Sequence, residues 1–191
     1  MTHEEINLAT KQAFADSLRI LLTQKDIRKI SIGELSAHCN KNRNTFYYHF
    51  TDIYDLLHWT LSQETDSINK TLLKYDNVKD ALHYVLVYID SQRELIKKIY
   101  LSLGRNIMRD LYYNSFYSLL LKTVQNGEKN MNIFVGEEFE NFLTNFYTEA
   151  LGGIIAQWLL DENPDSTEIL LDKLFFLCKH GIPKLLYDYS L

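Results

Sequence analysis

The scarcity of helix breakers constrains the fold of this chain more than any other feature. Only two prolines and seven glycines interrupt its 191 residues. Beyond residue 60 the apolar residues recur with helical spacing, and we find no strand pattern. The sequence therefore predicts an all-α fold. Because 46% of the residues are hydrophobic, the chain can bury a sizeable core, with room for one small and one larger helical domain.

Two short helices separated by a tight turn are predicted near the N-terminus. Residues 30–39 read as a helix with one apolar face. Asn40 is suited to end this helix, because asparagine tolerates the left-handed conformation of a helix C-terminus, and Asn42 is a good N-cap for the next helix. A turn of about three residues is the spacing of a helix-turn-helix, whose second helix enters the major groove of DNA.

The second of these helices has an unusual composition over residues 42–50. Successive helical residues are rotated by about 100°, so the adjacent Tyr47 and Tyr48 cannot both point into one core. Phe46 and Phe50, four apart, form the expected inner face. The other side chains are left to face solvent or DNA, and most of them can donate to phosphates or base edges: Arg43, Asn44, Thr45, Tyr47, Tyr48 and His49.

The stretch from Ile30 to Leu57, especially Arg43–Phe50 followed by Asp52–Leu57, resembles the DNA-binding domain of TetR-family transcriptional regulators. The resemblance implies a helix at about 3–24 packed behind the pair and a fourth helix that leads from about Asp52 into a ligand domain. It also implies a DNA-binding surface that includes a phosphate contact at Ser31; its other residues are Asn42, Arg43, Asn44, Thr45, Tyr47, Tyr48 and His49.

Three positions depart from the family pattern. Asn40 replaces the usual turn glycine, which its conformational tolerance allows. Lys41 replaces a small apolar residue, and we expect its aliphatic stem to pack while its ammonium reaches a phosphate. Ile53 stands where many members carry a lysine, so no phosphate contact is expected there.

The net charge of −5 is concentrated outside this segment. Residues 1–60 contain seven Lys/Arg and seven Asp/Glu, which leaves thirteen of the 20 basic and eighteen of the 25 acidic residues for positions 61–191. A neutral domain can still bind DNA if its cations share one face, since affinity depends on the number of phosphates neutralised. Five residues around the turn are candidates for such a face: Lys25, Arg28, Lys29, Lys41 and Arg43.

The sequence argues against membrane, disulfide and enzyme classes. No apolar run approaches the roughly 20 residues of a membrane span and no signal-peptide core is present, so we expect a cytoplasmic protein without a membrane partner. Cys39 and Cys178 are too few and too far apart for a disulfide framework, and we expect both to be reduced and packed. Nothing resembles a nucleophile elbow, a phosphate loop or a metalloprotease motif, so we expect neither an enzyme nor a cofactor.

A metal site is weighed because the chain has six histidines. Two pairs of potential ligands lie close in sequence, His38 with Cys39 and Cys178 with His180. Helical residues one or two apart point in different directions, so neither pair chelates one ion easily. We predict no metal site, and a metal-responsive regulator stays an alternative.

Several helix ends are predicted in the second part of the chain. Ser91 and Glu94 have the spacing of a capping box. Gly104 and the Asn126–Gly127 pair are expected C-terminal stops, which makes 127–136 the longest loop. Asn163 or Asp165 is expected to cap the last helix.

The last two helices, at about 137–160 and 166–187, are apolar on more than one side and must be buried on more than one side. We expect them to form a two-fold dimer interface, as helix-turn-helix proteins and TetR-like chains do; a monomeric helical core is the alternative. Residues 147–158 also resemble a TetR subgroup that includes regulators of dihydroxyacetone kinase genes. The candidate dimer residues are Phe146, Ile154, Trp158, Phe175 and Cys178.

Tyrosines are the candidates for an effector site, since ten of the thirteen lie beyond residue 60. A tyrosine offers an apolar body with one polar tip, which suits a small-molecule pocket, although ordinary half-buried packing explains such residues as well. We single out five of them: Tyr84, Tyr88, Tyr100, Tyr113 and Tyr117.

Together these observations predict a helix-turn-helix domain over 1–60 and an effector-binding and dimerisation domain over 61–191. The expected function is that of a homodimeric repressor on a palindromic DNA operator, released by an unidentified small-molecule effector. A TetR-like coactivator that binds protein and no longer relies on its own operator is the alternative.

Overall fold

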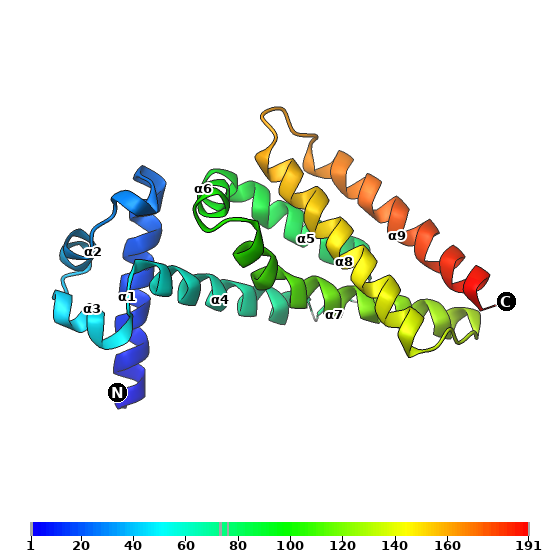
Figure 1. The fold of residues 1–191 in the computed structure, drawn as a ribbon, viewed down its shortest axis with the longest axis horizontal. Coiled ribbons are helices and arrows are strands. Elements are labelled where there is room, and N and C mark those ends of the chain that lie inside the picture. Colours follow the sequence, from blue (N-terminus) through cyan, green and yellow to red (C-terminus); the bar gives the residue numbers. More distant parts are fainter. Residues whose placement is uncertain (1, 73, 76, 191) are drawn as a thin grey trace. The chain divides into compact units, whose positions relative to one another are not determined.

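The structure is a computed structural model that describes residues 2–72, 74–75 and 77–190. These residues form helices and connecting loops without a strand, as expected (Figure 1). None of the helices within those ranges is both long and apolar enough to span a membrane. The helices are α1 (His3–Gln24), α2 (Ile32–His38), α3 (Arg43–His49), α4 (Ile53–Leu72), α5 (Val78–Ser91), α6 (Arg93–Leu103), α7 (Arg105–Met131), α8 (Glu137–Leu160) and α9 (Thr167–Tyr189), with a 3-10 turn at Ile27–Lys29.

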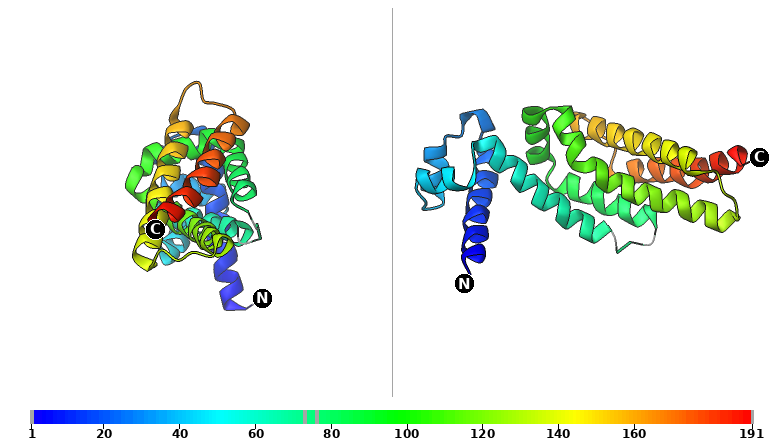
Figure 2. Two further views of the ribbon diagram at one scale, coloured as in Figure 1. Left: turned by 90° about the vertical axis from the view of Figure 1, so that its right-hand side faces the viewer. Right: turned by 60° about the horizontal axis from the view of Figure 1, so that its bottom comes forward.

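The chain divides into two compact units, whose helices can be followed in Figure 2. The first unit extends to Asp66, within α4, and also contains Glu94–Arg105. The second contains Ser67–Arg93 and the residues from Asn106 onward. The expected division at residue 60 lies inside α4, and the first unit also contains residues 94–105.

The first unit is built around α1. Thr2 and Glu5 form a capping box at its start, and Phe14 is completely buried against Phe46 of α3, with the ring centroids 5.3 Å apart in an edge-to-face arrangement. At the other end of α1 the ammonium of Lys98, on α6, donates to the carbonyl of Thr23 at 2.9 Å. A cation at this position satisfies a free carbonyl and opposes the negative end of the helix dipole.

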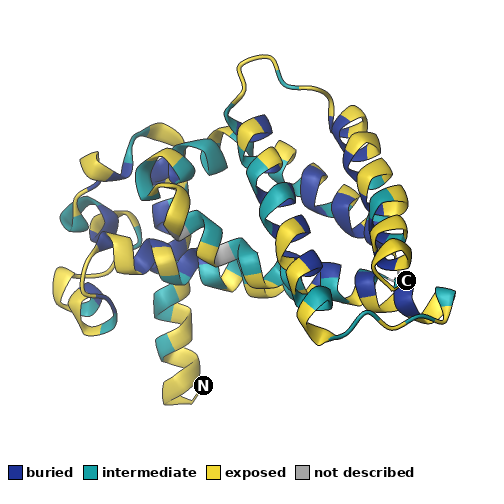
Figure 3. Ribbon diagram, turned by 45° about the vertical axis from the view of Figure 1, so that its right-hand side comes forward, coloured by how far each residue is buried: buried dark blue, intermediate teal, exposed yellow. Residues whose placement is uncertain are grey.

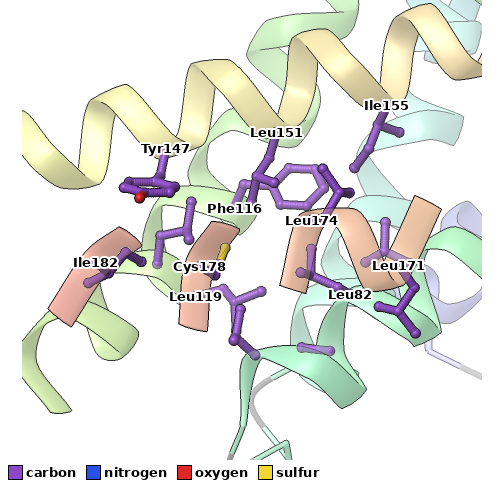
Figure 4. Close-up of a cluster of buried hydrophobic side chains, with 14 of the residues drawn as sticks. Leu82, Phe116, Leu119, Tyr147, Leu151, Ile155, Leu171, Leu174, Cys178 and Ile182 are labelled. Atoms are coloured by element: carbon purple, nitrogen blue, oxygen red, sulfur yellow. The ribbon is translucent and has the colours of Figure 1, made fainter. Parts of the chain in front are cut away.

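The second unit has its core between α5, α7, α8 and α9 (Figure 4). Leu82, Phe116, Leu151 and Leu174 bring one apolar side chain from each helix into this cluster. Cys178 lies among them, and burial raises the pKa of its thiol to about 11. The thiol is therefore neutral and packs as an apolar group.

Some helix ends match the sequence predictions and others do not. Gly104 follows α6 with a φ of 81°, as expected for a C-terminal stop. Gly127 is not a stop, because α7 continues to Met131. An added Cβ at Gly127 would lie 3.0 Å from the Leu186 side chain, so this glycine serves close helix packing. The loop is shorter than predicted and begins at Asn132, whose φ is 54°.

Two predicted caps are also wrong. Ser91 is still part of α5, and its hydroxyl donates to the Tyr88 carbonyl at 2.7 Å, so it forms no capping box for α6. The N-cap of α9 is Ser166, whose hydroxyl accepts from the amide of Ile169. Neither Asn163 nor Asp165 has this role.

Candidate nucleic-acid interface

The turn between α2 and α3 has the predicted local geometry. Asn40 adopts the left-handed conformation with a φ of 53°. The amide of Lys41 then donates to the carbonyl of Ser36 at 2.9 Å, which closes the end of α2. Asn42 is the N-cap of α3, since its side-chain oxygen accepts from the amide of Thr45 at 2.7 Å. These local bonds fix the direction in which α3 leaves the turn.

Helix α3 has one buried and one exposed face. Phe46 is completely buried and Phe50 is 4% exposed, so both anchor the helix on the core around Phe14. Tyr47 and Tyr48 are 59% and 71% exposed. The prediction that at least one phenol faces outward is confirmed for both, and Figure 3 shows the exposed residues along α2 and α3 in yellow.

Some of the polar candidates on this surface form capping hydrogen bonds within the chain, and others do not. Ser31 caps α2 by accepting from the amide of Glu34 at 3.1 Å, and Asn42 accepts from both the amide and the hydroxyl of Thr45. Arg43 and Asn44 are exposed at the start of α3. Capping oxygens are already occupied as acceptors, so the exposed donors of Arg43 and Asn44 are the better groups to meet DNA.

Fewer cations are available on the expected basic face than the sequence indicated. Lys25 forms an ion pair with Glu34 at 2.5 Å, and Arg28 forms two hydrogen bonds with the carboxylate of Asp26, each 2.9 Å long. The guanidinium of Arg28 lowers the pKa of Asp26 to about 2, which keeps this carboxylate ionised. Within the described residues, the remaining cations have no ion pair: Lys29, Lys41 and Arg43.

Lys41 is exposed. Its ammonium is free to reach a phosphate. Ile53, the other departure from the family pattern, is buried at the start of α4 and serves the core.

His49 lies at the end of α3 in an electropositive and partly buried setting. Burial lowers the pKa of its imidazole, and the nearby ammonium of Lys11 lowers it further. Lys11 itself stands over the ring of Phe50 at 5.6 Å and the ring of Trp59 at 5.7 Å. His49 is therefore neutral at physiological pH and offers one donor and one acceptor.

Comparisons with known proteins identify the family. A TetR family model described as "Transcriptional regulator C-terminal region" matches residues 76–180, which is more than half of the chain. The chain belongs to the TetR family of transcriptional regulators. No curated protein matches it.

Solved structures share the fold of this TetR-family chain. The dihydroxyacetone kinase operon activator DhaS is 20% identical, with a TM-score of 0.72 over 94% of this chain and 98% of that one. A TetR-family regulator from Streptomyces coelicolor is 11% identical, with a TM-score of 0.66 over 99% and 90%. NalD, the secondary repressor of the MexAB-OprM multidrug efflux pump in Pseudomonas aeruginosa, is 14% identical, with a TM-score of 0.55 over 91% and 96%.

The candidate effector tyrosines of this TetR-family chain lie on three helices, α5, α6 and α7. Tyr100 lies on α6 in the first unit, whereas the other four belong to the second. Tyr84 and Tyr88 are half-buried on α5. Tyr113 and Tyr117 lie on α7 with their rings stacked, 5.9 Å between centroids. Each of the five remains a candidate.

Tyr113 and Tyr117 instead take part in a regular series of polar contacts between two helices, which we name the α7–α8 pairs. The Tyr117 hydroxyl donates to the side-chain oxygen of Asn141 at 2.7 Å. One turn along α7, Tyr113 donates to Asn145. A further turn along, Arg109 pairs with Glu149. The α8 partners were not predicted from the sequence, although their spacing of four along one helix matches that of the two tyrosines.

Part of the expected dimer surface is exposed and part is not. Phe146 is 57% exposed and Ile154 lies on the same helix at the surface, 36% exposed. Trp158 and Cys178 lie in the core of the second unit, and Phe175 packs against that core below the ammonium of Lys79. These three side chains are occupied within their own chain, so they offer little to a second copy.

Other apolar side chains of α8 and α9, which the sequence did not single out, are exposed. Phe142 and Phe146 line a shallow hollow on α8 together with Asn145, Glu149 and Ala150. On α9 the exposed apolar residues are Ile169, Phe176, Leu177, Leu185, Tyr187 and Tyr189. We refer to Phe142, Phe146, Ile154, Phe176 and Leu177 as the α8–α9 surface.

Within the described ranges, no group of three or more His, Cys, Asp and Glu side chains is placed to hold a metal ion. His38, one of the residues weighed, shares a hydrogen bond of 3.0 Å with the hydroxyl of Ser17. Its imidazole thus ties α2 to α1.

Proposed function

We propose that this TetR-family regulator binds duplex operator DNA through the exposed face of α3. The observation that carries the proposal is the division of a seven-residue helix into a face buried through Phe46 and a face that exposes Tyr47 and Tyr48 beside Arg43. Folding alone gives no reason to keep two phenols and a guanidinium in water. Phosphates and base edges in a major groove are partners for such donors.

We further propose that two copies bind a palindromic operator, with the α8–α9 surface as the contact between them. Phe146 and Phe176 are 57% and 61% exposed, which is costly for large apolar side chains unless another surface covers them. A two-fold dimer would present two α3 helices to half-sites about one helical turn of DNA apart.

The regulator acts, in this proposal, as a repressor released by a small molecule. A ligand changes operator affinity only if it binds the DNA-competent and the incompetent arrangement with different affinities. The tyrosines of α5 and α7 are the candidate ligand contacts, because they are half-buried and lie within residues 76–180, which the family model matches.

The alternative function is that of an activator, either on its own operator or through a protein partner. One similar structure is named an operon activator, DhaS. The reduced basic face, with Lys25 and Arg28 paired within the chain, would suit a regulator that relies less on DNA. A test of operator binding distinguishes an activator that acts through a protein partner from the proposed repressor.

An electrophoretic mobility shift with the DNA upstream of the protein's own gene tests the function. The wild-type protein is expected to shift this DNA at a lower concentration than an unrelated duplex of equal length, and the Arg43→Ala and Tyr48→Ala variants are expected to require more protein. A wild-type protein that treats both duplexes alike would favour the protein-binding alternative.

A further inference from the structure

Gly33 lies within a helix, at a position where the backbone conformation does not require a glycine. It lies in the first turn of α2, and it is not among the glycines with positive φ. In a helix, glycine is less favourable than alanine, because its backbone loses more freedom on folding. A glycine at this position therefore calls for a reason outside its own backbone.

The Arg43 side chain supplies that reason. A Cβ added at Gly33 would lie 2.8 Å from Cζ and 2.9 Å from Nε of Arg43, with a terminal guanidinium nitrogen nearer still. Real Cβ atoms do not approach other atoms so closely, so any larger residue would displace the guanidinium. Arg43, at the first position of α3, thus folds back across α2 and places its charged end over Gly33.

The guanidinium lies there without using its donors. Among the described residues, it takes part in no hydrogen bond or ion pair, and its side chain is exposed. The absence of a side chain at Gly33 thus leaves room for the guanidinium, whose N–H groups remain free for another partner. An arginine in this state suits the planar, bidentate recognition of a phosphate or a base edge.

We propose that Gly33 is a positioning residue of the DNA interface, because it leaves the space in which Arg43 takes the orientation that meets DNA. This inference rests on the proposed function, because it assigns a task within the same site. A Cβ at position 33 would occupy the place of the guanidinium, so Arg43 would have to take another orientation. An Arg43 side chain that must be reordered on binding DNA costs conformational entropy.

The proposal makes stability and DNA affinity change in opposite directions. In Gly33→Ala the exposed and flexible Arg43 side chain can move away, so the fold is not strained, and alanine favours the helix. We therefore expect an unchanged or higher melting temperature together with weaker DNA binding. A residue with a purely structural role would change both quantities in the same direction.

A double-mutant cycle tests the inference. Binding to a duplex selected from a random library is measured by fluorescence anisotropy for wild type, Gly33→Ala, Arg43→Ala and the double variant. We expect Gly33→Ala to weaken binding about three- to tenfold in the presence of Arg43, and to have no effect when residue 43 is alanine. Equal effects in both backgrounds, or no effect in either, would overturn the proposal.

A second measurement on the free protein separates this inference from the proposed function. In nuclear magnetic resonance, a cross-peak between the Nε–H of Arg43 and the α-protons of Gly33 is expected in free wild type, because the guanidinium lies over Gly33. Absence of this cross-peak would refute the positioning role even if DNA binds well. A wild type that shows the cross-peak but binds no duplex would instead overturn the proposed function, and with it the task assigned to Gly33.

Discussion

Tyr48 is the most exposed aromatic residue of α3, and within the chain it contacts the neighbouring ring of His49. Its removal should leave the fold intact. We predict that Tyr48→Ala weakens operator binding by about 1–3 kcal/mol, the usual cost of one lost contact, with an unchanged melting temperature. Fluorescence anisotropy measures the affinity. Phe134→Ala, which removes an exposed ring from the loop before α8, is the control and should bind as wild type.

Lys41 is the residue of the turn that we expect to contact a phosphate. Because it is exposed and has no ion pair in the described parts of the chain, we expect its ammonium to neutralise one phosphate. The slope of log K against log salt should then shrink by about 0.9 per subunit in Lys41→Ala. Lys129→Ala, an exposed lysine of α7, should keep the wild-type slope. An identical slope in both variants would remove Lys41 from the interface.

His49 should make the stability of the first unit depend on pH. Burial, followed by Lys11, lowers the pKa of the imidazole below its ordinary value of 6.5 in the folded state. Protonation therefore favours the unfolded chain. The contribution of His49 is complete above the unfolded pKa and is lost as the pH falls through the lower folded pKa.

We predict that the melting temperature falls between about pH 7.5 and about pH 5 in wild type, and falls less in His49→Gln, which cannot be protonated. His83→Gln, on the exposed side of α5, should follow the wild-type curve. A His49→Gln curve parallel to wild type over this range would show that His49 does not contribute.

At the scale of elements, local chemistry was enough to predict the helix-turn-helix. The left-handed Asn40, the N-cap Asn42 and the stop at Gly104 depend on a few neighbouring residues. The role of Gly127 could not be predicted from its neighbours in the sequence. Its environment is set by Leu186, almost sixty positions away, and the sequence pattern alone does not show which distant side chain meets a glycine.

The α7–α8 pairs are expected to stabilise the second unit. The hydroxyl of Tyr117 donates to Asn141 at 2.7 Å, and burial raises the pKa of this phenol, so it remains a donor. Removing the hydroxyl in Tyr117→Phe should lower the free energy of unfolding by about 1 kcal/mol. Urea denaturation measures the change. Tyr187→Phe, an exposed tyrosine of α9, should have almost no effect, and equal stabilities for the two variants would contradict the role of the pair.

At the scale of the whole molecule, the apolar pattern of α8 and α9 predicted that both helices are covered on more than one side. The pattern could not show which apolar side chains face the core of their own unit and which are exposed. Trp158 and Cys178 serve the core of their own unit, whereas Phe142 and Phe176 are exposed. All four are apolar and helical, so only the packing of α5 and α7 against these helices distinguishes them.

The α8–α9 surface predicts a dimer that a single charge should disrupt. Placing an aspartate at Phe146 would bury an unpaired carboxylate in the proposed contact, at a cost of several kcal/mol. Phe146→Asp should sediment as a monomer at micromolar concentration and lose operator affinity, with α-helical content unchanged. Phe134→Asp places the same charge on the exposed loop before α8 and should remain a dimer. A monomeric wild type with full operator affinity would refute this arrangement.

The central claim, that two α3 helices of a dimer read DNA together, is tested most directly by selecting duplexes from a random library with the purified wild-type protein. We predict an enriched sequence made of two inverted half-sites whose centres lie about 10 base pairs apart, or a multiple of this spacing. Enrichment of a single unrepeated half-site, or of no sequence at all, would contradict it.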